Sequence, residues 1–290
     1  ELLKKGEVVA FPTETVYGLG ASLFLEDAIK KIFQAKGRPS DNPLIAHICD
    51  LSFVEKIAQE IPAEFYRLAE AFFPGPLTIV LPKKEEVPPI ATGGLNYIAL
   101  RMPRHKLAQQ LIRLVGSPLV APSANLSGKP SATSFSHVLE DFDGKIAGVL
   151  CAESSEIGIE STVVRWHEGR LEILRPGSIC SEELERCLQK KILFYKPKKE
   201  EGTPVSPGLK YRHYAPKAKV FLCTSENLPI ACDSSVKRMI LSNSPIGQEK
   251  IFSLETYSFY ALLRQVDFFK SDEVRIYGSY RKIYGFVFFS

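Results

Sequence analysis

The sequence predicts an α/β protein: a twisted mixed sheet covered by helices, followed by a smaller C-terminal α/β domain of Rossmann-like type. Short β-rich apolar runs alternate with amphipathic helical stretches along most of the chain. Apolar residues make up 45% of the 290 residues, which is enough to build a core. A segment rich in proline and glycine then interrupts the alternation. We therefore predict a large α/β domain over 1–194, a linker over 195–217 and a small domain over 218–290.

In the first domain, strands and helices follow one another with few long loops. Apolar residues at 25, 28, 29, 32 and 33 form a helical stripe, and Gly37 suits its C-terminal cap. The predicted helices are Leu25–Ala35, one that a Ser52/Glu55 capping box opens and that stops before Pro62, Ala63–Phe73, His105–Val115 and one that Ser181 caps and that runs to Lys190. The predicted strands are Glu7–Phe11, Pro43–Cys49, Leu77–Leu81, Tyr97–Met102, Leu119–Ala121, Ala147–Leu150, Thr162–Trp166 and Leu171–Leu174.

The linker holds four prolines and two glycines, so it predicts neither a helix nor a strand. A second α/β pattern follows it. The predicted elements there are strands Val220–Cys223, Val236–Leu241 and Val274–Tyr277 and helix Leu254–Phe268.

The charge of the chain is unevenly distributed. Residues 196–290 carry 15 basic and 9 acidic side chains, whereas residues 1–195 carry 22 and 24. The basic surplus lies mostly in the linker and predicts either a solvated tether or a cover for an anionic ligand. The six cysteines form no C-x-x-C pair, which argues against zinc and fits a reducing compartment. We expect no signal peptide, no membrane contact and a cytoplasmic protein.

Four polar stretches lie at the ends of predicted strands, where ligands bind in open α/β sheets. They are PTETVYGLG (12–20), KGRPSDNP (36–43), APSANLSGKPSAT (121–133) and GIESTVVR (158–165). Each has an ordinary structural interpretation: Gly18 and Gly20 could form a turn, and Lys36 and Arg38 could be a solvated helix end. Together, their hydroxyls, amides and cations predict a phosphate or carboxylate site. The chain has no P-loop motif and no complete dinucleotide fingerprint.

Six motifs in register resemble one family. FPTETVYGLGA, KGRPSDNPL, PGPLTIVL, APSANLSGKPSAT, GIESTVV and RPGSI are similar to the YrdC-like threonylcarbamoyl-AMP synthases, and SPGLKYRHYAPK is similar to the linker of their two-domain form. The resemblance implies a YrdC-like sheet. It also implies synthesis of threonylcarbamoyl-AMP and pyrophosphate from L-threonine, bicarbonate and ATP, for the t6A37 modification of tRNA. From about Tyr277 the chain departs from the family pattern.

The resemblance also implies the site. Lys36 and Arg38 would neutralise the ATP phosphates as the catalytic pair. The threonine site would consist of Thr15, His47, Arg101, Ala121 and Ser161. The ATP site would consist of Arg38, Asn42, Tyr97, Ser123, Asn125, Ser131, Arg175 and Tyr214. Mg²⁺ would bind with ATP without an assigned protein ligand, and the linker stretch Ser206–Pro216 would close over the nucleotide as a lid.

The implied partners are a downstream tRNA threonylcarbamoyl transferase complex and, weakly, tRNA itself, and we expect a monomer. Two other functions share the domain type. The first is an RNA-binding module, against which the net acidic first 195 residues and the absence of an RNA-recognition signature argue. The second is a carbamoyl transferase of hydrogenase maturation, which would need C-x-x-C zinc fingers that this chain lacks.

Overall fold

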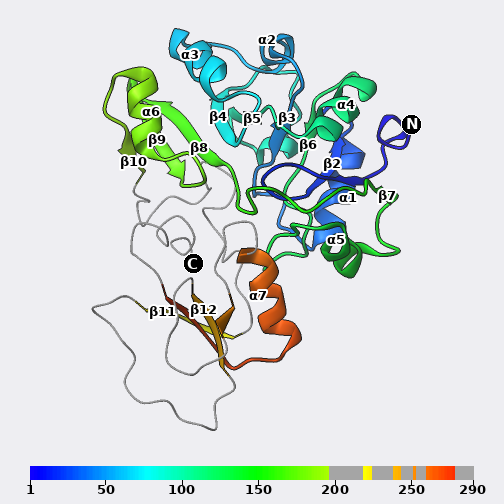
Figure 1. Cartoon of the computed structure of the whole chain (residues 1–290). Helices are drawn as coiled ribbons and strands as arrows, with labels where there is room; N and C mark the ends of the chain where they lie inside the picture. Colours follow the sequence, from blue (N-terminus) through cyan, green and yellow to red (C-terminus); the bar gives the residue numbers. More distant parts are fainter. Residues whose placement is uncertain (196–217, 224–237, 243–250, 253–258, 278–290) are drawn as a thin grey trace.

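The computed structural model describes residues 1–195, 218–223, 238–242, 251–252 and 259–277, and within them it forms two sheets (Figure 1). The larger sheet has ten strands in the order β10-β9-β8-β4-β5-β3-β6-β2-β1-β7, and its pairings are both parallel and antiparallel. The smaller sheet has four strands in the order β11-β14-β12-β13, all parallel. The predicted α/β class with a mixed main sheet is confirmed. The predicted lid with Tyr214, and the residues beyond Tyr277, lie outside the described residues.

The strands of the large sheet are β1 (Val9–Phe11), β2 (Gly18–Ser22), β3 (Ile45–His47), β4 (Leu77–Pro82), β5 (Tyr97–Arg101), β6 (Leu119–Val120), β7 (Gly148–Val149), β8 (Thr162–His167), β9 (Arg170–Arg175) and β10 (Leu193–Phe194). The helices of this part are α1 (Glu26–Lys36), α2 (Val54–Ile57), α3 (Ala63–Phe72), α4 (Lys106–Val115), α5 (Phe135–Phe142) and α6 (Ser181–Leu188), with 3-10 turns at Leu3–Lys5, Leu51–Phe53 and Pro89–Thr92. The elements of the second part are β11 (Lys219–Cys223), β12 (Arg238–Ser242), β13 (Ile251–Phe252), α7 (Phe259–Phe268) and β14 (Glu273–Tyr277).

The structure corrects the sequence prediction at two helix starts. The side chain of Asp50, not of Ser52, caps the turn before α2 by accepting from the Ser52 amide at 2.8 Å. The cap of α6 is Cys180, whose amide donates to Glu183 at 3.0 Å. In both cases a local backbone bond decides the boundary within one or two residues.

Four elements were missing from the prediction: β2, α5, β10 and β13. Strand β2 carries Gly18 and Gly20, which depress β propensity. Packing explains why glycine occurs in this strand: a Cβ on Gly20 would lie 2.7 Å from the ring of Phe11 on the neighbouring strand β1. The interpretation of these two glycines as a turn is therefore wrong.

The two faces of the large sheet have different partners, as the period of two along each strand requires. One face packs against α1, α3, α5 and α6 in the main core. Strand residues on this face are Ala46, Ile79, Leu81, Ile98, Leu100, Val164 and Ile173. Their sequence neighbours on the opposite face are Ile45, Val80, Ala99, Val163 and Leu174, which form a separate cluster. Helix α4 covers another part of this second face, where Ala108 and Ile112 pack against Phe11 and Leu119. Polar side chains on this face are thus held away from the main core and its helices.

The register of two parallel strands brings two predicted site residues together. His47 at the end of β3 pairs with Arg101 at the end of β5. The two residues are far apart in the chain but adjacent at the carboxyl ends of parallel strands, where α/β proteins place their ligands. Among the described helices, none is both long and apolar enough to cross a bilayer.

Helix α7 packs directly against the first domain. Its residues Phe259, Tyr260 and Leu263 share an apolar cluster with Val16 and Ile159 (Figure 1). These two partners precede β2 and β8, so the second domain touches the segments that carry polar motifs in the first.

Gly177 provides a test of how tightly the start of β8 is enclosed. A Cβ at Gly177 would lie 2.4 Å from the Thr162 nitrogen and 2.6 Å from the Glu160 oxygen, both backbone atoms that cannot move aside easily. We expect Gly177→Ala to lower the free energy of unfolding by about 3 kcal/mol, the upper range for overpacking. Urea denaturation measures it. Gly148→Ala is the matched control, since its Cβ would meet only Leu2 Cδ1 at an ordinary 3.6 Å; equal effects of the two substitutions would contradict the assignment.

Candidate active site

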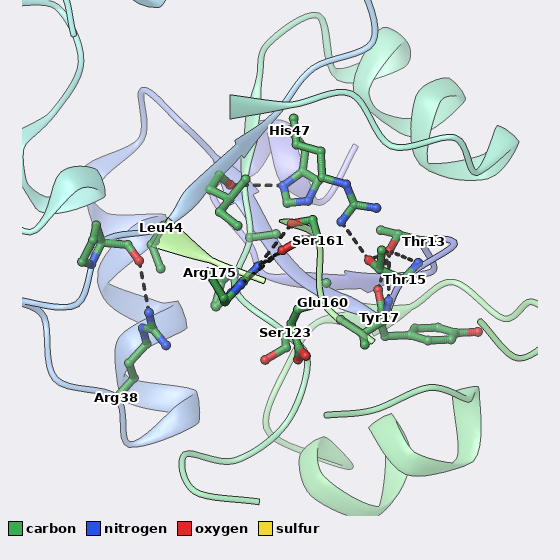
Figure 2. A pocket seen from close by; sticks show the side chains of 17 residues that line it. Thr13, Thr15, Tyr17, Arg38, Leu44, His47, Ser123, Glu160, Ser161 and Arg175 are labelled. Carbon is green, nitrogen blue, oxygen red and sulfur yellow. Dashed lines mark hydrogen bonds between the residues drawn. The ribbon is translucent and has the colours of Figure 1, made fainter. Parts of the chain in front are cut away.

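A pocket opens on the second face of the large sheet, at the ends of β3 and β5 (Figure 2). Its walls come from the loops that the sequence singled out. The lining residues are Thr13, Thr15, Val16, Tyr17, Gly18, Arg38, Pro43, Leu44, Ile45, His47, Arg101, Ala121, Pro122, Ser123, Glu160, Ser161 and Arg175. All five residues predicted for the threonine site line this one pocket, together with Arg38, Ser123 and Arg175 of the predicted ATP site.

Arg101 is the buried centre of one wall. Its Nε donates to the Gly75 carbonyl at 3.1 Å and its Nη1 to the Thr15 hydroxyl at 2.8 Å. Its Nη2 lies 2.7 Å from Glu14 Oε1 in an ion pair of which both side chains are less than 5% exposed. The contact with Glu14 is close but lacks hydrogen-bond geometry, so the two hydrogen bonds of Arg101 use one N–H of Nε and one of Nη1. Arg101 is therefore held in place while N–H groups on its terminal nitrogens are not yet used in hydrogen bonds.

The hydroxyl of Thr15 has a fixed direction. Thr13 Oγ1 donates to the Val16 carbonyl at 2.6 Å, so its single proton is used there. In the 2.9 Å contact between the two threonine hydroxyls, Thr15 must therefore donate to Thr13. Because Thr15 also accepts from Arg101, the loop 13–16 is connected to β5 through a continuous chain of hydrogen bonds.

Glu14 keeps its charge in this buried place. Burial raises the pKa of its carboxyl, but the charge and close contact of Arg101 and a hydrogen bond from the Arg104 amide outweigh burial and lower the pKa below its usual value. His47 shows the opposite balance. Burial first, and the nearby Arg101 charge second, lower its pKa to about 3, so the imidazole is neutral near pH 7. Its Nδ1 donates to the Ile45 carbonyl at 3.1 Å.

Ser161 and Arg175 form the next wall. Arg175 donates from Nε and Nη2 to the Ser161 carbonyl at 3.2 and 2.9 Å, and Nη2 also reaches the Ser161 hydroxyl at 3.2 Å. That hydroxyl is 2.7 Å from Thr78 Oγ1 on β4. In Figure 2 the labelled side chains of Thr15, His47, Ser161 and Arg175 lie together, with Arg38 to one side. The segment from Glu160 to Thr162 is thus fixed by contacts from two neighbouring strands.

Arg38 follows the end of α1. Gly37 adopts a left-handed φ of +61°, which confirms the predicted cap, and the Arg38 amide donates back to the Phe33 carbonyl at 3.0 Å. The chain then turns, and Arg38 Nη2 donates to the Pro43 carbonyl at 3.1 Å. The cap and this turn together present the guanidinium to the pocket.

Lys36 has a different position from Arg38. It is only 3% exposed, and its ammonium donates to the carbonyl of Ser123 at 2.5 Å and to that of Asn125. Burial, and then the charge of Arg38, lower the pKa of Lys36 well below its usual value. The structure thus gives Lys36 a role in holding the 123–125 loop, and its side chain does not line the pocket. Its predicted contact with phosphate stays a prediction.

Four further residues of the predicted ATP site do not line this pocket: Asn42, Tyr97, Asn125 and Ser131. The amide nitrogen of Asn125 donates to the carbonyls of Leu126 and Lys129, both at 2.9 Å, so this side chain stabilises its own loop. Tyr97 is half exposed at the start of β5. Asn42 is buried, and neither its amide nitrogen nor its amide oxygen has a partner among the described residues.

Glu160 is a pocket residue to which the sequence assigned no role. It is the only carboxylate among the lining residues of this pocket, beside three arginines. Ser131 Oγ donates to its Oε1 at 2.5 Å, and Tyr260 of α7 donates to its Oε2. The sequence signal was the position of Glu160 in the motif GIESTVVR, but its partner Tyr260 comes from the second domain.

The arrangement is suited to binding anions. Three arginines face one pocket whose lining holds one carboxylate, Glu160, while Glu14 pairs with Arg101 behind the lining, and burial strengthens such charge contacts. Within the described ranges, no cluster of three or more His, Cys, Asp or Glu side chains could hold a metal ion. The pocket lining also lacks a nucleophile hydrogen-bonded to a general base, so positioning and charge neutralisation are what it can supply.

Comparison with known proteins finds two matching family models. The model described as "Telomere recombination" (Sua5/YciO/YrdC) matches residues 1–177, and the model of the threonylcarbamoyl-AMP synthase C-terminal domain matches residues 179–280. The chain is 52% identical over 221 residues to the threonylcarbamoyl-AMP synthase of Pyrococcus abyssi and 49% identical over 223 residues to that of Bacillus subtilis. These matches cover 76% and 77% of this chain but 65% and 64% of the relatives' own lengths.

A solved structure agrees with these matches. P. abyssi Sua5 complexed with L-threonine superimposes with a TM-score of 0.87 at 41% identity, covering 96% of this chain and 87% of that one. The likeness therefore extends over both domains.

The buried pair of Glu14 and Arg101 predicts a specific pH dependence. The folded pKa of Glu14 lies below its unfolded value near 4.5, so its stabilisation is fully present above about pH 4.5 and is lost as pH falls through the folded pKa. We expect Glu14→Gln to cost about 3 kcal/mol at pH 7, because Arg101 is left buried without its counter-charge. Urea unfolding of both proteins from pH 7 to pH 3 measures the difference.

The difference in unfolding free energy between the two proteins should shrink as pH falls from about 4.5 toward the lower folded pKa of Glu14, because protons bind this carboxyl in the unfolded chain before they bind it in the folded protein. Titratable groups that do not interact with Glu14 are common to both proteins and cancel in this comparison. A difference that stays constant down to pH 3 would show that the ion pair does not determine the stability.

Proposed function

The chain belongs to the Sua5/YciO/YrdC family, and from that premise we propose that it is an L-threonylcarbamoyladenylate synthase, a nucleotidyltransferase that uses L-threonine, bicarbonate and ATP. The observation that carries the proposal is the composition of one pocket: it collects Thr15, His47, Arg101, Ala121 and Ser161 beside the arginines at 38 and 175. The product would serve t6A modification of tRNA. The relatives named threonylcarbamoyl-AMP synthase support the same conclusion.

The proposed reaction has two steps. The threonine amine either adds to CO2 and releases a proton or condenses with bicarbonate and releases water, and both routes give an N-carboxylate. A carboxylate oxygen then attacks the α-phosphorus of ATP, the bond to the bridging oxygen breaks, and pyrophosphate leaves. Every reactant is an anion or becomes one, so charge neutralisation and alignment account for most of the rate enhancement.

The residues have complementary parts in these steps. Arg101 would bind the threonine carboxylate through its remaining terminal N–H groups, with Glu14 and Gly75 holding the guanidinium in orientation. The hydroxyl network of Thr15 and Ser161 would recognise the threonine side chain. Neutral His47 would add a polar contact without repelling the arginines. Arg38 and Arg175 would carry the phosphates.

Mg²⁺ would enter with the nucleotide. No cluster of metal-binding side chains occurs in the described part of the chain, and both oxygens of Glu160 already accept hydrogen bonds. The residues present therefore fit an ion held by the triphosphate itself, which would supply further neutralisation of phosphate charge.

The proposed wider role follows from the product. A mixed anhydride is a transient intermediate, so we also propose that a tRNA threonylcarbamoyl transferase complex consumes the product. We further propose that the synthase is a monomer. The alternative of an RNA-binding module is not favoured, since this pocket holds buried, preorganised groups of small-molecule size rather than an exposed basic surface.

The decisive experiment is an assay of pyrophosphate release. With ATP and bicarbonate, we expect release that depends on L-threonine and is at least 10²-fold slower with L-valine, whose methyl leaves hydroxyl partners such as Thr15 and Ser161 unpaired (roughly 3 kcal/mol). Mass spectrometry identifies the adenylate. Release at the same rate with valine, or with no amino acid, would refute the assignment.

The role of Arg38 has its own test. Arg38→Ala should lower threonine-dependent synthesis by about 10²-fold or more, roughly 3 kcal/mol of transition-state stabilisation, because a phosphate charge loses its partner. Arg38→Lys should recover only part of it, since lysine lacks the planar fork. Circular dichroism checks the fold, and wild-type turnover by a folded Arg38→Ala protein would remove Arg38 from the phosphate site.

A further inference from the structure

The C-terminal domain reaches the pocket through one face of α7. Phe259, Tyr260 and Leu263 pack in one cluster with Val16 and Ile159, which are themselves buried. Val16 lines the pocket, and Ile159 directly precedes the pocket residue Glu160. The helix therefore lies directly behind two segments of the pocket wall.

Tyr260 acts on the wall through Glu160. An ionised carboxylate can only accept hydrogen bonds, so the hydroxyls of Tyr260 and Ser131 both donate to it, one to each oxygen. Ser131 is completely buried and Glu160 is 9% exposed. Hydrogen bonds to a charged group in such a setting are stronger than neutral ones. Glu160 thus connects a residue of the second domain to the 121–133 loop.

Arg264 lies one helical turn after Tyr260, on the same side of α7. Its Nη2 donates to Asp141 Oδ2 and to the Pro130 carbonyl, both at 2.8 Å. Asp141 has no solvent exposure, and it also accepts from the Leu126 amide at 3.2 Å and from Lys129 at 2.8 Å. Burial raises the pKa of the Asp141 carboxyl, but hydrogen bonds from Arg264 and Lys129 and the charge of Arg264 outweigh burial and lower the pKa below its usual value, so the carboxyl stays charged. The Arg264–Asp141 pair therefore ties residues 126–130 to α5 and α7.

The 121–133 loop is held at its start and at its later part by different elements. Lys36 of α1 binds the carbonyls of Ser123 and Asn125, while Arg264 binds the Pro130 carbonyl and Tyr260 reaches Ser131 through Glu160. This loop carries Ser123 in the pocket wall. Without the contacts from α7, the loop would keep its backbone bonds to Tyr17 and its bonds to Asp141, but it would lose the side-chain contacts at Pro130 and behind Ser131.

We propose that Tyr260 and Arg264 are positioning residues, through which the C-terminal domain holds the 121–133 loop in the conformation that binds the nucleotide. The inference deepens the proposed function and rests on it. It also assigns a direction to Ser131: because its proton goes to Glu160, its oxygen can only accept from a ligand. Any atom of ATP that contacts Ser131 must then be a hydrogen-bond donor, a ribose hydroxyl or the adenine amine, and not a phosphate oxygen.

The test compares Tyr260→Phe, Arg264→Met and Arg264→Lys with two controls in the full chain. Tyr66→Phe is a matched removal of a hydroxyl from a half-exposed tyrosine, and Gln265→Ala changes an exposed neighbour on α7. We expect Tyr260→Phe and Arg264→Met each to raise the Kd for ATP, measured by calorimetry, roughly tenfold. Arg264→Lys should recover part of this, and the KM for threonine should change less than twofold.

Hydrogen exchange on the ligand-free proteins provides the second readout. Amides of residues 124–133 should exchange roughly tenfold faster in the two disruptive variants, with the controls unchanged. A lower melting temperature with unchanged ATP affinity and unchanged exchange in this loop would show that α7 is only a structural support and would overturn the inference.

The two proposals can fail separately. A wild-type protein that binds ATP but releases no threonine-dependent pyrophosphate would refute the synthase activity. The Kd for ATP and the hydrogen exchange of the loop would still test the role of α7. Deoxy-ATP supplies a check on Ser131. If removal of either ribose hydroxyl, or replacement of the adenine amine in inosine triphosphate, leaves the affinity unchanged in all three analogues, the direction assigned to Ser131 is wrong.

Discussion

The buried guanidinium of Arg101 is the contact on which the pocket depends. A charge removed from water is tolerated only where several partners compensate it, and Arg101 has three: the Gly75 carbonyl, the Thr15 hydroxyl and the Glu14 carboxylate. These partners come from three separate segments of the chain. By satisfying one arginine, the fold therefore fixes the loop before β2, the turn before β4 and the end of β5 relative to one another.

The same principle repeats around the site. A pocket for anionic substrates needs cations, and cations placed side by side repel one another. The structure offsets each concentration of positive charge with a carboxylate that is itself hydrogen-bonded: Glu14 beside Arg101, Glu160 in the pocket wall and Asp141 beside Arg264. The pocket stays receptive to anions because these carboxylates are committed to protein donors and only Glu160 is part of its lining.

The two cationic side chains at the end of α1, Lys36 and Arg38, have different roles. Arg38 has a long planar head that reaches the pocket, whereas the ammonium of Lys36 is buried on two backbone carbonyls. One cation can thus meet the ligand while the other holds the loop opposite. The contacts of α7 with Glu160 and Asp141 extend this support across the domain boundary, which gives the second domain a place in the architecture of the site.

Much of this protein was readable from its sequence. The α/β class, the positions of most helices and strands, and the loops that line the pocket follow from local patterns: apolar periodicity, glycine and proline positions and clusters of hydroxyls and cations. Long motifs in register also carried the family resemblance, and the resemblance implied the five residues of the threonine site, including Arg101. Local signals suffice there because each depends on residues that are close together in the chain.

Only the tertiary structure decided the rest. Gly18 and Gly20 belong to a strand, and these positions are glycine because the ring of Phe11 occupies the space where a side chain would be. Lys36 binds carbonyls about ninety residues away, and Glu160 meets Tyr260 a hundred residues later. Such contacts leave no local pattern, since they depend on strand register and on how one domain packs against another. The sequence determined which chemical groups are available, and packing determined which of them face the ligand and which hold the others in place.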